Sequence, residues 1–267
     1  MTTAINGAGR PFAGFSDFWR QVRNATARLL CLDYDGTLAP FAIEPMHAHP
    51  LPGIADLLRD MAAGGTTEVA ILSGRPAEEV AALLGNPRLT IVGSHGFEWW
   101  PVDGDKRTLR PTPVQQRGLD TIRNALQRCQ SGQKVEVKVA SLALHTRGMD
   151  PAAAAAMERE TMARWGSWAL LHDLEWRMFN GGVEVRCIGR NKGDALLDLL
   201  DLQPRDVLAV YIGDDETDED AFVALRGRGI GIRVGHAGAP TAAQAHLADC
   251  TAVAGFLHTW LQVTGTP

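Results

Sequence analysis

Two carboxylates stand two positions apart in the segment Asp33-Tyr-Asp35-Gly-Thr, directly after a short apolar run. A glycine follows the second carboxylate and lets the backbone turn sharply there. One carboxylate that attacks a substrate and another that transfers protons are the two parts of nucleophilic catalysis by aspartate. The spacing indicates this chemistry, supported by a divalent cation. A simple turn between a strand and a loop would show the same sequence pattern.

A hydroxyl group marks the end of a later apolar run. Ser73 and Gly74 follow the apolar residues 69–72, and Pro76 stands at the expected first position of a helix. A hydroxyl beside a helix start can donate a hydrogen bond to a phosphate oxygen. An ordinary strand-to-helix turn is the structural alternative.

Lys192 stands at the beginning of a predicted helix over residues 192–200. Cations are stabilised at the opposite end of a helix, so its place needs another reason. The position indicates that the lysine faces an anion, and the alternative is a lysine on the surface.

Six acidic residues follow the apolar run of residues 207–212. The helix dipole explains Glu219 and Asp220 if a helix begins there. It explains Asp214 and Asp215 less well, because they stand at the strand end. Carboxylates gathered at that point are ligands that magnesium prefers.

In this order, the four segments resemble the motifs of the haloacid dehalogenase superfamily of aspartate-nucleophile phosphatases. The fuller series LDYDGTLAP, LSGRP, GSHGFE, LALHTR, NKGDAL and GDDETDEDAF is similar to the trehalose-6-phosphate phosphatases in particular. The resemblance extends from Leu32 to about Val234. It implies a magnesium-dependent phosphatase that acts on a small sugar phosphate.

The resemblance also implies a role for each motif residue. Asp33 would attack phosphorus to form an aspartyl-phosphate, and Asp35 would protonate the leaving oxygen and later activate water. Ser73 and Lys192 would hold the phosphoryl oxygens. Magnesium would be bound by Asp33, the backbone carbonyl of Asp35 and Asp214, with Asp215 and Asp218 as further candidates. The candidate substrate-binding residues are Thr37, Arg75, His95, Lys138, His145, Arg147, Glu184 and Arg186.

Three of these substrate-binding candidates have structural alternatives. Arg147 and Arg186 would fit surface ion pairs equally well, and His95 would fit a core or turn position. Glu184 and Arg186 stand two positions apart in a predicted strand, so we expect them on one face of it.

Composition excludes several other classes of protein. The chain has 267 residues, 45% of them hydrophobic, and a net charge of −5. It has no long basic run, which argues against binding to nucleic acid or to an anionic membrane surface. No stretch approaches the ~20 apolar residues that span a bilayer. We expect a monomer, although composition does not decide the oligomeric state.

The cysteines indicate a reducing compartment. Cys31, Cys129, Cys187 and Cys250 are scattered without the spacing of metal ligands, and two of them lie in apolar runs. We expect buried free thiols at Cys31 and Cys187 and a cytoplasmic protein. The first fifteen residues lack the layout of a signal peptide.

Helical and strand patterns alternate over residues 17–93 and again over 192–234. This alternation predicts an α/β fold, a Rossmann-like core whose parallel sheet has helices on both faces. In such a sheet functional residues gather at the carboxyl ends of the strands, where all four motifs fall.

The middle of the chain has a different pattern. We expect strands at 134–139, 141–146, 168–172 and 183–188 and a helix at 150–165. This predicts a smaller α/β cap domain over 111–188, inserted between core segments 1–110 and 189–267. By resemblance, the cap closes over the substrate.

Two classes of function remain open at this point. The first is a phosphatase for trehalose 6-phosphate, or for sucrose 6-phosphate or a glycosyl-3-phosphoglycerate. The second is a non-catalytic module that senses a sugar phosphate, whose signature would be loss of the nucleophile. Asp33 and its partner residues are all present, which favours the enzyme.

Overall fold

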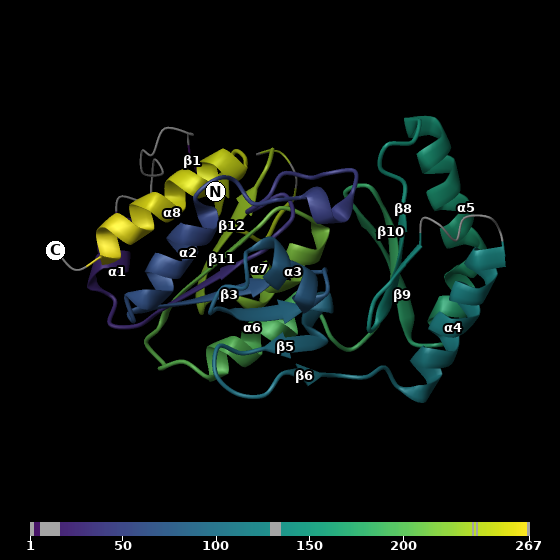
Figure 1. The fold of residues 1–267 in the computed structure, drawn as a ribbon, viewed down its shortest axis with the longest axis horizontal. Coiled ribbons are helices and arrows are strands. Elements are labelled where there is room, and N and C mark those ends of the chain that lie inside the picture. The colour runs from purple at the N-terminus through teal and green to yellow at the C-terminus, as the bar shows by residue number, and fades with distance from the viewer. Residues whose placement is uncertain (1–2, 6–16, 129–134, 237, 239, 266–267) are drawn as a thin grey trace.

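The computed structural model describes residues 3–5, 17–128, 135–236, 238 and 240–265, so Cys129 lies outside the described part. Its strands form one sheet of nine strands and one of four (Figure 1). The larger sheet has the order β1 (Thr3–Ile5), β13 (Ala245–Leu247), β12 (Gly229–Val234), β11 (Leu208–Gly213), β2 (Arg28–Leu32), β3 (Thr67–Leu72), β4 (Thr90–Gly93), β5 (Glu98–Trp100) and β6 (Arg107–Thr108). Its pairs are parallel as far as β4, and β5 and β6 continue it antiparallel.

Helices cover both faces of this sheet, as predicted. Strand β2 separates the two cores: Leu30 and Leu32 face one, and Leu29 and Cys31 face the other. The first core contains residues of α1 (Phe18–Asn24), α2 (Ile54–Ala63), α3 (Ala77–Leu83) and α8 (Cys250–Thr264). The second contains residues of α6 (Lys192–Asp201) and α7 (Glu219–Ala224). Burial on both faces is why these strands read as continuous apolar runs.

Short 3₁₀ turns complete this part of the chain. They are η1 (Pro45–His47), η2 (Ser94–Gly96) and η4 (Glu216–Asp218). The last of them directly precedes α7, so the chain enters this helix through a tighter turn.

The second sheet is antiparallel, with the order β7 (Val135–Val137), β8 (Ser141–His145), β10 (Gly182–Cys187) and β9 (Leu174–Phe179). Helices α4 (Pro113–Arg128) and α5 (Pro151–Leu170) pack on one face, around Ile122, Leu142 and Val185. Figure 1 shows these helices on the outer side, with the four-stranded sheet between them and the larger sheet. Its open face is therefore directed at the strand ends that carry the motifs.

The strand predicted over residues 168–172 is wrong. Helix α5 continues to Leu170, and the strand begins at Leu174. The ring of His172 lies 2.9 Å from the carbonyl oxygen of Trp168, one helical turn earlier. Asp173 then takes a positive φ of 53° and turns the chain into β9. The aromatic and apolar run that suggested a strand is the end of a helix that buries Ala169 and exposes Leu170.

The predicted buried thiols are confirmed at Cys31 and Cys187, which are both unpaired. Among the described residues, no helix combines the length and the apolar character that crossing a membrane requires.

Candidate active site

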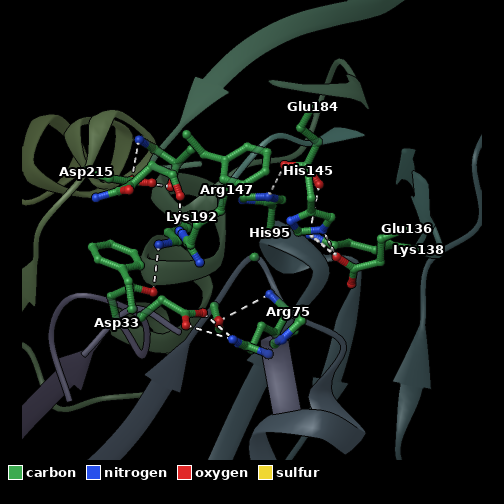
Figure 2. Close-up of a pocket in the computed structure, with 18 residues that line it drawn as sticks. Asp33, Arg75, His95, Glu136, Lys138, His145, Arg147, Glu184, Lys192 and Asp215 are labelled. Carbon is green, nitrogen blue, oxygen red and sulfur yellow. Dashed lines mark hydrogen bonds and ion pairs between the residues drawn. The ribbon is translucent and has the colours of Figure 1, made fainter. Parts of the chain in front are cut away.

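A pocket lies between the strand ends of the larger sheet and the open face of the four-stranded sheet (Figure 2). The larger sheet and its loops contribute Asp33, Asp35, Phe41, Pro45, Ser73, Gly74, Arg75, His95, Lys192, Asp215 and Thr217. The four-stranded sheet and its loops contribute Glu136, Lys138, His145, Arg147, Phe179, Asn180 and Glu184. The fold thus brings together most of the residues that the sequence predicts for the site.

Lys192 faces two carboxylates at the bottom of this pocket. Its Nζ lies 2.8 Å from Oδ1 of Asp33 and 2.7 Å from Oδ1 of Asp218. Asp33 follows β2, and Lys192 is the first residue of α6, whose N-terminus Asn191 caps. Burial lowers the pKa of Lys192. The charges of Asp218 and Asp33 outweigh burial and raise this pKa well above its ordinary value. The anion that the helix position implied is therefore present in the protein itself.

Three carboxylates converge beside this lysine. One ligand atom each from Asp33, Asp214 and Asp218 lies within 4.8 Å of the others. Burial, and then the charge of Asp218, raise the pKa of Asp33 well above its ordinary value. Burial and the charge of Asp33 do the same for Asp214. Lys192 does not offset the repulsion fully, so this cluster is suited to a divalent cation.

Gly36 makes room for this cluster. A Cβ atom on Gly36 would lie 2.2 Å from Oδ2 of Asp214, and the backbone φ is +73°. Any other residue would be strained there and would push the carboxylate of Asp214 away. The glycine of the first motif therefore lets two distant segments approach, which fits a shared cation.

Asp218 has a structural role in the same cluster. It is fully buried and accepts hydrogen bonds from the Tyr211 hydroxyl at 2.5 Å and from the backbone N–H groups of Asp214 and Asp215 at 2.8 and 3.0 Å. Burial raises its pKa, but Lys192 and these donors outweigh burial and lower it. Asp218 thus holds the loop that presents Asp214.

Asp215 lines the pocket instead of joining the three-carboxylate cluster. Its Oδ1 accepts hydrogen bonds from the backbone N–H and the hydroxyl of Thr217, at 2.8 and 2.7 Å. These bonds cap the turn η4 and orient the carboxylate toward the pocket.

Asp35 is bound by a guanidinium group. Arg75 donates from Nε to Oδ2 of Asp35 at 2.6 Å and from Nη2 to Oδ1 at 2.8 Å. The backbone N–H of Arg75 donates to Oγ of Ser73 at 3.2 Å. The segment after β3 therefore carries both the hydroxyl predicted to bind phosphate and the partner of the predicted acid-base residue.

At the other end of the pocket, charged residues converge on Glu184. Lys138 Nζ lies 3.0 Å and Ser141 Oγ 2.7 Å from its Oε1, while His95 Nε2 lies 2.8 Å from its Oε2. Burial raises the pKa of Glu184, but Lys138 and His95 outweigh burial and hold it well below its ordinary value. An ionised carboxylate, an ammonium and an imidazole at one place suit the hydroxyl groups of a sugar.

The sequence-based prediction missed Glu136. It lies 2.7 Å from Nε2 of His145 and lines the pocket. Burial raises its pKa, but His145 and Lys138 outweigh burial and lower it. Glu136 stands two positions before Lys138 in an alternating strand, so it shares a face with a predicted site residue. That spacing is the signal that would have identified it.

Arg147 borders the pocket. Its guanidinium donates to the carbonyl oxygen of Ala42 at 2.8 Å and to that of Asn180, and it lies over the ring of Phe41. It thereby joins the loop after the first motif to the turn between β9 and β10.

Two predicted substrate-binding residues do not line the pocket. The hydroxyl of Thr37 is buried and has no hydrogen-bond partner among the described residues. Arg186, on the same strand as Glu184, is 3% exposed and binds Glu175 at 2.8 Å and Asp220 at 3.2 Å. Arg186 therefore joins the four-stranded sheet to helix α7 of the larger sheet.

Known proteins share both the sequence pattern and the fold. The model of a family described as trehalose-phosphatase matches residues 31–250. A probable trehalose-phosphate phosphatase 4 of Oryza sativa subsp. japonica is 32% identical over 241 residues, which is 86% of this chain and 64% of the relative. An alpha,alpha-trehalose-phosphate synthase (UDP-forming) B of Dictyostelium discoideum is 30% identical over 219 residues, which is 80% of this chain and 28% of the relative.

The match to these relatives covers less than two thirds of their own length. Among solved structures, the C-terminal domain of a C. albicans trehalose-6-phosphate phosphatase aligns with a TM-score of 0.82 at 22% identity. That alignment covers 100% of this chain and 99% of the other. At this identity the likeness shows the shared fold.

Proposed function

The chain belongs to the trehalose-phosphatase family, and from this we propose that it hydrolyses trehalose 6-phosphate to trehalose and phosphate. One observation carries the proposal: a single pocket holds the Asp33–Asp35 pair and Lys192 at one end and Glu136, Lys138 and Glu184 at the other. The first end suits a phosphate group and the second a hydroxyl-rich sugar.

The two sheets of the molecule provide these two ends. We take residues 1–110 and 189–267 as the core and 111–188 as the cap. The cap supplies Glu136, Lys138 and Glu184 at the sugar end, and the core supplies the residues around Asp33. A substrate that reaches both ends would be enclosed, and enclosure of this kind excludes bulk water from the reaction.

In the first step, a carboxylate oxygen of Asp33 attacks the phosphorus atom and the bond to the sugar oxygen breaks. Asp35 gives its proton to that oxygen, so trehalose leaves as a neutral alcohol. Arg75 pairs with the carboxylate of Asp35. This ion pair must therefore open before Asp35 can carry the proton that it donates. The product on the enzyme is an aspartyl-phosphate at Asp33.

In the second step, Asp35 takes a proton from a water molecule whose oxygen attacks the same phosphorus atom. The bond between phosphorus and Asp33 breaks, which regenerates the Asp33 carboxylate and releases inorganic phosphate. Here the Arg75–Asp35 pair holds the carboxylate in its accepting form. Lys192 touches Asp33 and is the ammonium closest to a phosphoryl group bound there, while Ser73 lies beside it as a donor.

The carboxylates fit a magnesium ion. Asp33, Asp214 and the backbone carbonyl of Asp35 would bind it, with Asp218 completing the cluster and Asp215 as a further candidate. When bound, it would supply the positive charge that offsets the repulsion between the carboxylate and the phosphate. Asp218 also organises the loop, so its contribution extends beyond any contact with the metal.

Phosphate release from a panel of substrates tests the function. Trehalose 6-phosphate, glucose 6-phosphate, sucrose 6-phosphate and a glycosyl-3-phosphoglycerate are compared with and without magnesium. We expect a strong, magnesium-dependent preference for trehalose 6-phosphate. A preference for another sugar phosphate would keep the chemistry and replace the substrate. No release from any of them would favour a sugar-phosphate sensor.

A further inference from the structure

A histidine of the larger sheet touches a carboxylate of the four-stranded sheet inside the pocket. His95 lies in η2, directly after β4, and Glu184 lies in the middle of β10. The two side chains meet at 2.8 Å and are 6% and 3% exposed (Figure 2). Their contact joins the phosphate end of the site to the sugar end.

The backbone around His95 is held in an unusual conformation. Ser94 and His95 have φ values of +48° and +56°, a region that residues other than glycine rarely adopt. The backbone N–H of Ser94 donates to the carbonyl of Arg75 at 2.7 Å, and that of His95 donates to the carbonyl of Ser73 at 3.0 Å. His95 is therefore fixed directly to the segment that is proposed to bind phosphate.

The imidazole ring also packs on that segment. A Cβ atom at Gly74 would lie 2.6 Å from Cε1 of His95, so only glycine leaves room for the ring there. The ring is thus held from both sides, by the backbone bonds of its own loop and by residue 74. Such packing fixes the direction in which Nε2 points.

The two oxygens of Glu184 are divided between the two sheets. Lys138 and Ser141, which belong to the four-stranded sheet, bind Oε1. His95, from the larger sheet, binds Oε2. Among the contacts described for this carboxylate, the histidine is the one that fixes it relative to the phosphate end.

We propose that His95 is a positioning residue that sets the place of Glu184 relative to segment 73–75 and thereby selects substrates with a sugar at the correct distance from the phosphate. The inference rests on the proposed function, because it assigns Glu184 to the sugar. It differs from the sequence-based expectation that His95 contacts the sugar itself. The imidazole acts through the carboxylate, by donating a hydrogen bond from Nε2.

The test compares His95→Ala, His95→Gln and His258→Ala. Glutamine keeps an N–H donor for Glu184, and His258 is an exposed histidine of α8 far from the pocket. Kinetics are measured with trehalose 6-phosphate and with 4-nitrophenyl phosphate, which has no sugar. Small-angle X-ray scattering of the ligand-free proteins reports whether the two sheets separate.

For His95→Ala we expect KM for trehalose 6-phosphate to rise about 10-fold or more, the value of one hydrogen bond to a charged group. The loss with 4-nitrophenyl phosphate should be several-fold smaller than the loss with trehalose 6-phosphate, and the radius of gyration should increase. His95→Gln should recover most of the KM and the scattering, and His258→Ala should match wild type.

Three results would overturn the inference. Equal losses on both substrates would place His95 at the phosphate end or in the fold. A selective rise in KM with unchanged scattering would mean that it contacts the sugar directly. Wild-type kinetics for His95→Ala would remove its role altogether.

If wild type prefers another sugar phosphate, the proposed substrate fails, and that compound replaces trehalose 6-phosphate in the same comparison. If wild type releases no phosphate at all, the proposed function fails and the role in substrate selection fails with it, while the scattering still shows whether His95 holds the two sheets together.

Discussion

Arg75 binds both carboxylate oxygens of Asp35, with donor distances of 2.6 and 2.8 Å. The planar guanidinium fixes the orientation of the carboxylate as well as its charge. This orientation determines where Asp35 can deliver and accept a proton.

Replacing Arg75 with lysine keeps the charge and removes the second hydrogen bond. Because Asp35 then rotates freely, we expect kcat/KM for trehalose 6-phosphate to fall about 10- to 100-fold. Steady-state kinetics measure this, with Arg88→Lys as the control, since Arg88 pairs with Asp103 on the exposed surface. Equal activity of Arg75→Lys and wild type would contradict a role for the paired geometry.

Asp33→Asn should abolish turnover and keep the fold. An amide does not form the aspartyl-phosphate, so we expect a loss of at least about 10³-fold in kcat. Burial and Asp218 already disfavour the charged form of Asp33, so the neutral amide should leave thermal stability close to that of wild type. Phosphate release and thermal unfolding measure the two effects, and substantial residual turnover would disprove the nucleophile assignment.

Asp218→Asn should destabilise the protein more than Asp214→Asn does. Asp218 is fully buried beside Lys192, and losing its charge leaves that ammonium poorly compensated. We expect the free energy of unfolding to fall by about 3–5 kcal/mol. Asp214→Asn removes a repelling carboxylate and should mainly raise the magnesium concentration needed for activity. Urea unfolding and magnesium titration separate the two, and equal stabilities would argue against the structural role of Asp218.

Magnesium should stabilise the fold in a pH-dependent manner. Burial raises the pKa values of both Asp33 and Asp214. The charge of Asp218 raises that of Asp33 further, and the charge of Asp33 raises that of Asp214, so the folded state holds these protons more tightly. Without the cation, their contribution to stability is full below the ordinary aspartate pKa of 3.8 and is lost as the pH rises through the raised values. Binding of a cation to the ionised carboxylates should reverse this loss.

Thermal unfolding with and without magnesium at about pH 5 and about pH 7.5 measures this linkage. We expect the larger increase in Tm at the higher pH. At a hundredfold excess of magnesium over its Kd, the free energy of unfolding should rise by about 2.7 kcal/mol. Asp214→Asn provides the control, because carboxyl groups outside this cluster titrate equally in both proteins. An identical response of that variant would exclude Asp214 from the metal site.

Arg186→Met should reduce stability without changing substrate preference. The buried guanidinium joins Glu175 of β9 to Asp220 of α7. Its loss removes this ion pair from Asp220 and leaves Glu175 with Arg177. We expect the free energy of unfolding to fall by about 1–3 kcal/mol, with an unchanged ratio of activity on trehalose 6-phosphate and 4-nitrophenyl phosphate. A selective rise in KM for the sugar phosphate would return Arg186 to the substrate site.

The sequence alone predicted the residues of the proposed phosphate end because its signals are local. Asp33, Ser73, Lys192 and Asp214 each follow a buried strand or begin a helix, and parallel strands bring such positions to one edge. The conformation of residues 168–172 could not be predicted correctly from the sequence. Whether this apolar run ends a helix or forms a strand depended on which of its side chains α4 and the sheet would bury.

The tertiary structure alone decided which charges meet. Glu184 and Arg186 share one face of β10, yet the first reaches His95 and the pocket while the second reaches Asp220. Glu136 likewise joined the site because β7 faces the larger sheet. Local sequence determines the face on which a side chain stands. The partner of that side chain depends on how two sheets pack together, and contacts between distant segments leave no pattern in a single sequence.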